Sequence, residues 1–179
     1  MLIRRPLRVR TLLVAGVLAA LGAALVVPLA ASGGSSSAVS RLDAKTQSEA
    51  DLWEIDQIEV KFHRATSHHD INLMMSLWAP GSVFNIGTAT LTGKAQIRHW
   101  FLTQNKAFQA NPHWESDTPS YKIRISLNGD KATIYFECHY VDTKTGQIVT
   151  EAGVTHDLQK INGQWLITNS ASSNATLSP

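Results

Sequence analysis

The stretch "IYFECHYVD", from Ile134 to Asp142, places the only cysteine of the chain, Cys138, directly before a histidine, His139. These neighbours could form a thiolate–imidazole nucleophile pair, contribute to a metal site, or simply lie in a β-strand. The β-branched and aromatic residues around them predict a strand, in which successive side chains point to opposite faces. Cys138 and His139 therefore cannot act together as nucleophile and base, and we interpret Cys138 as a small apolar residue beside Phe136.

The same alternation divides this strand into an apolar and a polar face. The apolar face comprises Ile134, Phe136, Cys138 and Tyr140. The polar face comprises Thr133, Tyr135, Glu137 and His139. If the polar face lines a pocket, Glu137 could act as a carboxylate beside His139, because residues two apart on a strand share a face. If the apolar face looks inward, His139 lies outside or at an interface, and the alternation leaves both arrangements open because one β-bulge exchanges them.

The seven histidines are the first candidates for acid–base chemistry, because the unperturbed pKa of imidazole is the closest to neutral. Three of them, at the end of a predicted helix, fit capping or solvated roles: His63, His68 and His69. His99 fits the exposed side of another helix. His156 stands next to Asp157, where a structural ion pair or hydrogen bond is the expected role.

The sequence predicts neither a metal site nor a disulfide framework. It contains no HExxH motif and no His-x-His pair, and the adjacent His68 and His69 cannot point the same way on a helix. A single cysteine excludes an intramolecular disulfide and a thiolate cluster for zinc. We expect no metal and no organic cofactor.

The first 31 residues predict export from the cytoplasm. Four arginines and no acidic residue precede an uncharged apolar run at residues 11–31, which is the pattern of a signal peptide. The run also approaches the ~20 residues that cross a bilayer as a helix, so a cleaved signal peptide and an uncleaved membrane anchor both fit. Either would place the body in the cell envelope or outside the cell, with membrane contact only through this segment.

The charge of the remaining chain argues against a nucleic-acid partner. Four of the 16 Lys and Arg residues lie in the leader, which leaves 12 against 14 acidic residues and a net charge of −2. No basic stripe is present, so nucleic-acid binding is not expected.

The body predicts helices followed by strands. After a flexible Gly/Ser-rich linker at residues 32–47, apolar residues at 3–4 spacing predict an amphipathic helix over residues 48–67. Asp70 is the expected N-cap of a short second helix over residues 71–79, and residues 94–109 predict a third helix. A short strand is expected before Gly87, and residues 87–93 are expected to form a turn with room for a second short strand.

The C-terminal half predicts an antiparallel meander. Four strands joined by tight turns, two of them Asn-Gly turns, are expected at residues 121–127, 131–142, 148–161 and 165–172. Residues 172–179 are expected to form a disordered tail. The fold class is therefore α+β, with a curved antiparallel sheet and the N-terminal helices on its concave face in a cone-like barrel. Such a cone tends to enclose a ligand pocket.

The order of these segments resembles the SnoaL-like domain of the nuclear transport factor 2-like superfamily. The resemblance rests on "HHDINLMMSLWAPGSVFNIG" after the first helix, on "LTGKAQIRHWF", and on "AGVTHDLQKINGQWLI" with its Asn-Gly turn followed by Trp. It implies a cone-shaped domain over residues 48–171. The superfamily hosts dehydratases, isomerases, cyclases and proteins without known activity, so the fold does not define the reaction.

A finer resemblance concerns His113 and His139. The segment "HWESDTPSYKI" resembles one in scytalone dehydratases and places His113 on one of their two active-site histidines, with His139 near the other. The resemblance implies that the pair is catalytic, in a cofactor-independent elimination. Thr66 and Ser67 replace the Tyr-Asp pair of the dehydratases, which departs from this match. Ketosteroid isomerases of the same superfamily carry an aspartate base and a tyrosine, where this chain has Asn85-Ile86 and Phe62, so neither acid–base apparatus is intact.

We therefore expect a cofactor-independent dehydratase, isomerase or cyclase that acts on a small apolar or polycyclic ligand. Its substrate is expected to contact Phe62, Thr66, Tyr135 and Glu137. The alternative is a non-catalytic ligand-binding or protein-association domain of the cell envelope, which the missing helix acid and the leader favour. A homodimer formed through the sheet is also expected.

Overall fold

A computed structural model describes residues 35–105, 108, 113–116 and 120–173 of the 179-residue chain. The predicted leader and residues 174–179 of the predicted tail lie outside the described residues. The helices are α1 (Ser35–Ser67), α2 (Ile71–Ser76) and α3 (Gly93–Thr103). The strands are β1 (Trp78–Ile86), β2 (Ala89–Thr92), β3 (Trp114–Ser116), β4 (Tyr121–Asn128), β5 (Lys131–Asp142), β6 (Gln147–Ile161) and β7 (Gln164–Ser173).

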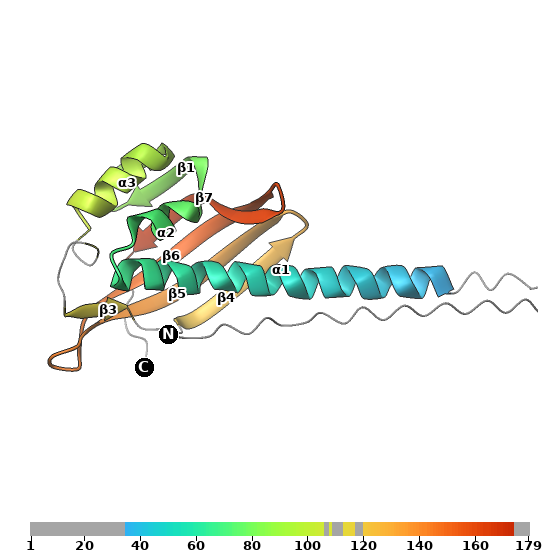
Figure 1. Ribbon diagram of the computed structural model, residues 1–179, viewed down its shortest axis with the longest axis horizontal. Coiled ribbons are helices and arrows are strands. Elements are labelled where there is room, and N and C mark those ends of the chain that lie inside the picture. Colours follow the sequence, from blue (N-terminus) through green and yellow to red (C-terminus); the bar gives the residue numbers. More distant parts are fainter. Residues whose placement is uncertain (1–34, 106–107, 109–112, 117–119, 174–179) are drawn as a thin grey trace, which may run out of the picture.

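The strands form one curved sheet in the order β2-β1-β7-β6-β5-β3, and β4 pairs with the other half of the β5 edge (Figure 1). The predicted α+β class with a curved sheet is confirmed. Neighbouring strands pair antiparallel with one exception, because β1 and β7 are parallel. These two strands are far apart in sequence, so no tight hairpin constrains their relative direction.

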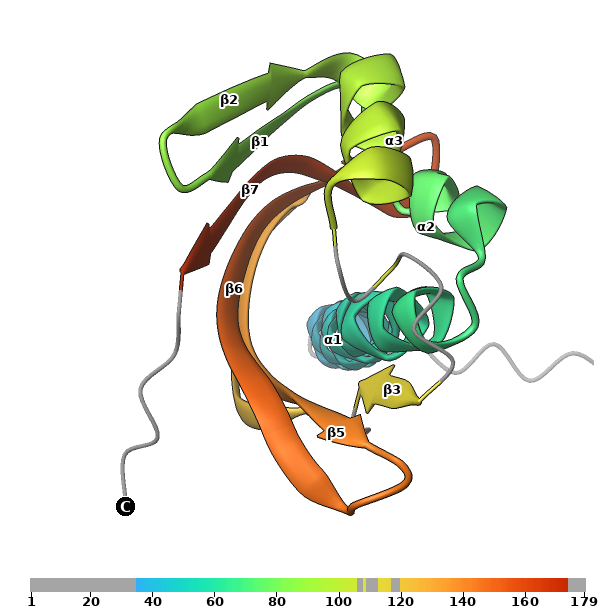
Figure 2. The same ribbon diagram turned by 90° about the vertical axis from the view of Figure 1, so that its left-hand side faces the viewer.

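The sheet curls around the C-terminal half of α1 (Figure 2). The apolar positions of α1 point into the curl, where Ile55, Ile58 and Phe62 are buried against Phe136 of β5 and other core residues. Phe101 of α3 closes the core from another side, with its ring centroid 6.0 Å from that of Phe62. Each such side chain stabilises the fold by about 1.5–3 kcal/mol through burial, so this core fixes the position of α1.

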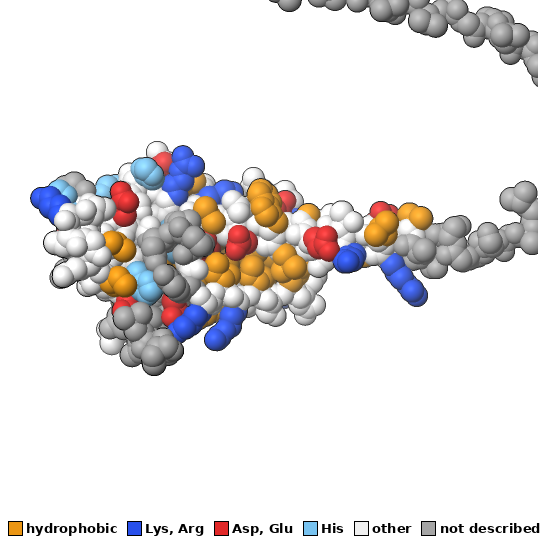
Figure 3. Space-filling model, turned by 90° about the horizontal axis from the view of Figure 1, so that it is seen from below, with side chains coloured by type: hydrophobic (Ala, Val, Ile, Leu, Met, Phe, Trp, Pro, Cys, Tyr) orange, Lys and Arg blue, Asp and Glu red, His pale blue; other side chains and the backbone are white. Residues whose placement is uncertain are grey.

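Helix α1 begins at Ser35, well before the predicted start at residue 48, so the described part of the predicted flexible linker is helical. The residues after Ser40 include several good helix formers, and Lys45 lies 3.7 Å from Glu49 one turn later. Residues 39–50 are exposed, and this part of the helix protrudes from the body (Figure 1). Acidic, basic and hydrophobic side chains are interspersed along it (Figure 3).

Asp51 fastens the middle of α1 to the hairpin between β6 and β7. Its Oδ1 atom accepts hydrogen bonds from Lys160 Nζ and, at 3.1 Å, from Trp165 Nε1. Burial raises the pKa of Asp51, but these bonds outweigh burial and hold the pKa below its ordinary value. The Trp165 that follows the Asn-Gly turn is thus a docking point for the first helix.

The ends of the short helices follow local sequence. Asp70 is the N-cap of α2, as predicted, because its Oδ1 atom accepts bonds from the backbone N–H groups of Asn72 (3.0 Å) and Leu73 (2.9 Å). Helix α3 ends at Thr103, short of the predicted residue 109. A turn follows it, in which Asn105 Oδ1 accepts a bond from the backbone N–H of Phe108 at 2.9 Å.

The predicted meander is confirmed for β4 to β7, including the turn at Gly129, whose φ of +61° suits glycine. The predicted start of the tail at residue 172 is too early, because Ser172 still pairs with Val154 of β6. None of the helices within the described residues is long and apolar enough to cross a bilayer.

Candidate functional site

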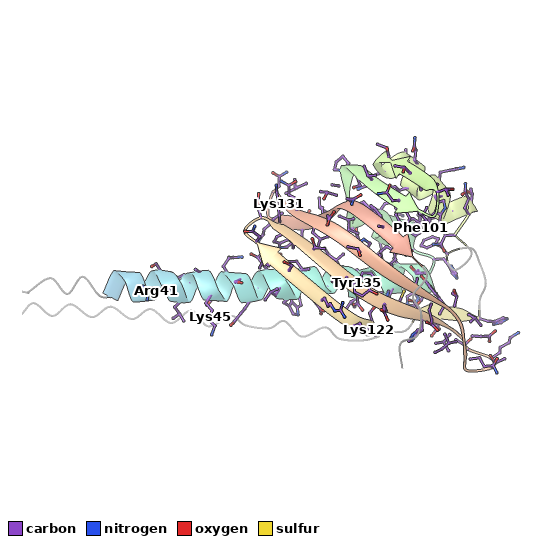
Figure 4. All side chains as sticks on the ribbon, turned by 180° about the vertical axis from the view of Figure 1, so that it is seen from behind. Arg41, Lys45, Phe101, Lys122, Lys131 and Tyr135 are labelled. Carbon is purple, nitrogen blue, oxygen red and sulfur yellow. The ribbon has the colours of Figure 1, made fainter. Side chains whose placement is uncertain are left out.

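The structure settles which face of β5 looks inward. Ile134, Phe136 and Cys138 are fully buried. Ile134 and Phe136 belong to the core around α1, and Cys138 continues the same face in a smaller cluster with Tyr140 and Ala152. Tyr135 and Glu137 therefore point to the outer face, which Figure 4 shows for Tyr135. The apolar arrangement of this strand is the correct one along residues 134–138.

On the outer face, Tyr135 and Glu137 bind each other and two cations. The Tyr135 hydroxyl donates to Glu137 Oε1 at 2.6 Å, Lys122 Nζ lies 3.0 Å from Glu137 Oε2, and the Arg124 guanidinium lies over the Tyr135 ring. The bonds from Tyr135 and Lys122 hold the pKa of Glu137 below its ordinary value. The expectation that Tyr135 and Glu137 line the cone pocket is thus corrected, because both side chains point away from the core.

The two histidines that the resemblance singles out lie along the pairing of β3 with β5. The carbonyl of His113 accepts a bond from the backbone N–H of Thr143 at 2.6 Å, just before β3 begins. His139 is buried and lies opposite Glu151 of β6. Since Thr143 is four residues beyond His139, the backbones of His113 and His139 lie about 13 Å apart along the strand direction. The catalytic role of this pair stays a prediction.

A different set of polar side chains is buried inside the cone. Glu59 and His63 are one turn apart on α1, both with no exposed surface, and Glu59 Oε1 lies 3.8 Å from His63 Nδ1. The backbone N–H of Ser120 donates to Glu59 Oε1 at 2.7 Å, and Ser120 Oγ lies 3.0 Å from His63 Nε2. Glu59 Oε2 is buried without a hydrogen-bond partner among the described residues. A buried carboxylate oxygen of this kind is able to contact a ligand.

This arrangement differs from the linear serine–histidine–carboxylate relay of hydrolases. Ser120 Oγ also lies 3.2 Å from His63 Nδ1, so the hydroxyl sits beside both ring nitrogens. The distance from Glu59 Oε1 to His63 Nδ1 exceeds that of a hydrogen bond. The group is therefore suited to proton transfer by a carboxylate and an imidazole rather than to nucleophilic attack by serine.

His156 of β6 is the second imidazole of the interior. Its Nδ1 atom lies 2.9 Å from Ser170 Oγ of β7, and both residues are fully buried. Its ring packs against Phe62, Phe136 and Trp78, at centroid distances of 5.3, 5.4 and 6.0 Å. Burial, reinforced by nearby His63, lowers the pKa of His156 to about 3, so the ring is neutral at physiological pH.

An apolar cavity of about 190 Å³ opens at the mouth of the cone, and none of these polar groups lines it. Its walls include Phe62, Phe84, Trp100, Phe101, Tyr140 and Val154. Phe62 forms both a wall of the cavity and a contact of His156, so this ring separates the apolar mouth from the polar interior. Larger hollows lie outside the cone, one on the outer face of the sheet and one between α1 and β3.

Of the four predicted substrate contacts, the structure brings Phe62 to the cavity and buries Thr66 nearby on the same helix. The Thr66 hydroxyl donates to the carbonyl of Phe62 at 2.9 Å. A substrate contact by either residue stays a prediction. No cluster of three His, Cys, Asp or Glu side chains able to hold a metal ion occurs in the part of the chain that the structure describes.

The sequence interpretation missed Glu59, His63 and His156. His63 was expected to be a cap or solvated, yet it lies inside because it shares the buried side of α1 with Phe62. His156 was expected to bind Asp157, but Asp157 faces outward, where Thr133 Oγ1 donates to it at 3.1 Å. The spacing of the three missed residues in the sequence could have predicted their burial. Glu59 and His63 lie on the helix side that carries Ile55, and His156 lies on the same strand face as Val154.

The chain belongs to the SnoaL-like domain family, which it matches over residues 47–171. A comparison with functionally curated proteins gives no match. The curved sheet with its enclosed helix is also the fold of solved structures described as nuclear transport factor 2-like (NTF2-like) proteins.

Solved structures share the fold at low sequence identity. An NTF2-like protein with a cystatin-like fold from Novosphingobium aromaticivorans is 16% identical with a TM-score of 0.64, over 78% of this chain and 91% of that chain. A protein of Streptomyces avermitilis, named provisionally as a dehydratase of the NTF2-like family, is 14% identical (TM-score 0.56; 72% and 98% covered). One of Shewanella frigidimarina, named provisionally as a ketosteroid isomerase, is 15% identical (TM-score 0.54; 65% and 92% covered). These likenesses show the fold alone.

Proposed function

We propose that this domain binds a small, largely apolar molecule in the cone and transfers a proton at one of its carbon atoms without a cofactor. Such a step is common to isomerases, dehydratases and cyclases, the classes that the sequence predicts. The observation that carries the proposal is the buried pair of Glu59 and His63, with Glu59 Oε2 unpartnered among the described residues. Two neighbours of the fold carry dehydratase and isomerase names, which agrees with this class of chemistry.

The roles of the groups follow from their contacts. The backbone N–H of Ser120 holds Glu59 Oε1, so the other carboxylate oxygen is available to take a proton from a carbon acid. The electron pair of the broken C–H bond moves to the acceptor oxygen of the substrate as an enolate. His63 lies beside the carboxylate and is able to receive the proton or return it. The apolar surroundings exclude water and strengthen each electrostatic contact.

The size of the cavity limits the ligand. A volume of about 190 Å³ lies below the roughly 300–1,000 Å³ that is usual for drug-sized ligands. One or two rings suit this space better than the larger polycyclic compounds that the sequence interpretation allowed. A ligand that reaches Glu59 must also move the Phe62 ring aside, because Phe62 lies between the cavity and the polar groups.

The test uses 2-tetralone and 2-indanone, small bicyclic ketones with acidic α-protons. In D₂O, exchange of these protons is followed by ¹H NMR with and without the protein. We expect the protein to accelerate exchange of at least one ketone, and Glu59→Gln to remove about 100-fold or more of the acceleration. Circular dichroism and thermal unfolding of the variant verify that it folds.

Glu137→Gln is the matched control, because it makes the same change on the outer face of the sheet. It should retain wild-type exchange. No acceleration by the wild-type protein, or equal rates in folded Glu59→Gln and wild-type protein, would overturn the proposal. Saturable binding of both ketones without acceleration would instead establish the alternative, a ligand-binding domain without activity.

We further propose that the domain acts outside the cytoplasm and that residues 1–31 direct its export. The support is the sequence pattern of a basic start followed by an uncharged apolar run. N-terminal sequencing of the exported protein tests this proposal. A start near Gly33 indicates a cleaved signal peptide, an intact N-terminus in the membrane fraction indicates an anchor, and retention in the cytoplasm contradicts export.

A further inference from the structure

His156 stands out among the buried polar groups because its protein contacts use only one side of the ring. Nδ1 lies 2.9 Å from Ser170 Oγ, whereas Nε2 is buried with no hydrogen-bond partner in the described part of the chain. The rings of Phe62, Phe136 and Trp78 surround it. Aromatic faces offer an N–H group only a weak contact, so none of the described residues gives Nε2 a full hydrogen-bond partner.

The hydrogen-bond accounting assigns the proton to Nε2. Ser170 is fully buried, and His156 is the side chain that its hydroxyl contacts. If Nδ1 carried the proton, the Ser170 hydroxyl hydrogen would have no acceptor among the described residues, which is costly in a buried site. If Ser170 donates to Nδ1, the Ser170 hydroxyl is satisfied, and Nε2–H is the one donor of these two side chains without a partner among the described residues. The neutral ring therefore presents one N–H donor.

The His156 ring does not line the mouth cavity itself, but it packs against a residue of the cavity wall. Val154, the preceding inward-facing residue of β6, lines the cavity, and so does Phe62, whose ring centroid is 5.3 Å from that of His156. Trp78 adds a second neutral donor nearby, since its Nε1 atom is also buried without a partner within the described ranges. Both donors are uncharged.

The charges of the interior exclude an anionic ligand. None of the buried residues that the structure describes is lysine or arginine, whereas Glu59 contributes an acidic group. His63 is charged only when protonated, and Glu59 already lies beside it. A carboxylate ligand would lose its hydration without gaining a fixed cation. A carbonyl oxygen, by contrast, needs only a hydrogen-bond donor.

We propose that the cone selects an uncharged ketone or aldehyde, whose oxygen accepts a hydrogen bond from His156 Nε2–H. The inference rests on the proposed function, because it names the substrate class of the same site. In the proton-transfer step, the oxygen that gains the electron pair as an enolate remains bonded to this donor. His156 is then the residue that distinguishes a carbonyl compound from its hydrocarbon and carboxylate analogues.

Three ligands of nearly equal shape test the inference. Acetophenone carries a carbonyl, α-methylstyrene replaces its oxygen by a CH₂ group, and benzoate carries a charge. Their dissociation constants are measured from the indole NMR signals of the full-length protein. Acetophenone should bind about tenfold more tightly than α-methylstyrene, the contribution of one hydrogen bond in a buried site, and benzoate should bind most weakly.

Variants of His156 complete the test. His156→Phe should bring the preference for acetophenone over α-methylstyrene close to one, and His156→Gln, which retains a neutral N–H donor, should restore part of it. Equal binding of the two ligands by the wild-type protein, tighter binding of benzoate, or an unchanged preference in folded His156→Phe would overturn the inference. Binding requires no turnover, so the preference can fail while ketone exchange persists, or persist while exchange fails.

Discussion

The domain holds two pairs of histidines in contrasting surroundings. His63 and His156 are fully buried in the cone, where both rings contact the ring of Phe136 at 5.4 Å, and His63 has a carboxylate beside it. His113 and His139 flank the pairing of β3 with β5, because His113 directly precedes β3 and His139 directly precedes the paired end of β5. The difference teaches that the packing of a chain decides which of its polar side chains point into the interior. The positions that a relative uses do not decide this. Under the proposed function, the fold carries its acid–base groups at other helix and strand positions than the scytalone dehydratases do.

The largest expected effect is on stability, and it distinguishes substitutions on the inner face of β5 from those on its outer face. Phe136→Ala removes a ring with no exposed surface that contacts Phe62, His63 and His156. We expect it to lower the free energy of unfolding by about 3–5 kcal/mol. Tyr135→Phe, one residue away on the outer face, removes a single hydrogen bond and should cost about 1 kcal/mol or less. Urea titration measures both values, and similar losses would contradict the assignment of the faces.

The buried histidine should make stability depend on pH. The pKa of His156 is about 3 in the folded protein against an ordinary value of 6.5. The unfolded chain therefore binds the proton first, and stability falls as the pH decreases below about 6.5, by up to about 1.4 kcal/mol per pH unit. Urea titrations between pH 7 and 4.5 should show a flatter profile for His156→Gln. Parallel profiles of this variant and wild type would show that His156 is not held neutral by the core.

A smaller effect compares two carboxylates with lowered pKa values, Asp51 and Glu137. Asp51 is buried and joins α1 to Lys160 and Trp165, whereas the bonds of Glu137 lie on the solvent-facing side of the sheet. Asp51→Asn should therefore lower the unfolding temperature by more than Glu137→Gln, because it removes bonds that hold α1 against the β6–β7 hairpin, whereas the bonds of Glu137 stay within the sheet. For both residues the lowered pKa means that the stabilisation is present at neutral pH and is lost as the pH falls through the range below about 4. A larger loss in Glu137→Gln would contradict this ranking.

Much of the fold follows from local sequence signals. The 3–4 spacing of apolar residues located the buried side of α1, Asp70 marked the start of α2, and the Asn-Gly turns delimited the strands of the meander. The early start of α1 was missed because glycine and serine at the start of residues 32–47 outweighed the helix formers that follow. The parallel pairing of β1 with β7 depends on contacts far apart in the chain, which periodicity does not report.

The candidate site was harder to predict, because Glu59, His63 and His156 occupy positions that usually carry apolar core side chains. A charged residue on an amphipathic helix is normally assigned to solvent, so the acidic side chain of Glu59 gave no reason to place it inside the cone. Strand alternation placed His156 on the same face as Val154, but only the tertiary packing shows that this face encloses α1. The resemblance to scytalone dehydratases directed attention to His113 and His139 because it transfers positions rather than surroundings.

The most direct test of this account measures ketone exchange in two histidine variants. His63→Gln changes the interior pair, and the double variant His113→Gln/His139→Gln changes the edge pair by the same chemistry. With 2-tetralone or 2-indanone in D₂O, we expect the interior variant to lose about 100-fold of the acceleration and the folded double variant to stay within about twofold of wild type. A loss in the double variant with full exchange in His63→Gln would contradict the account and locate the chemistry at the β3–β5 edge.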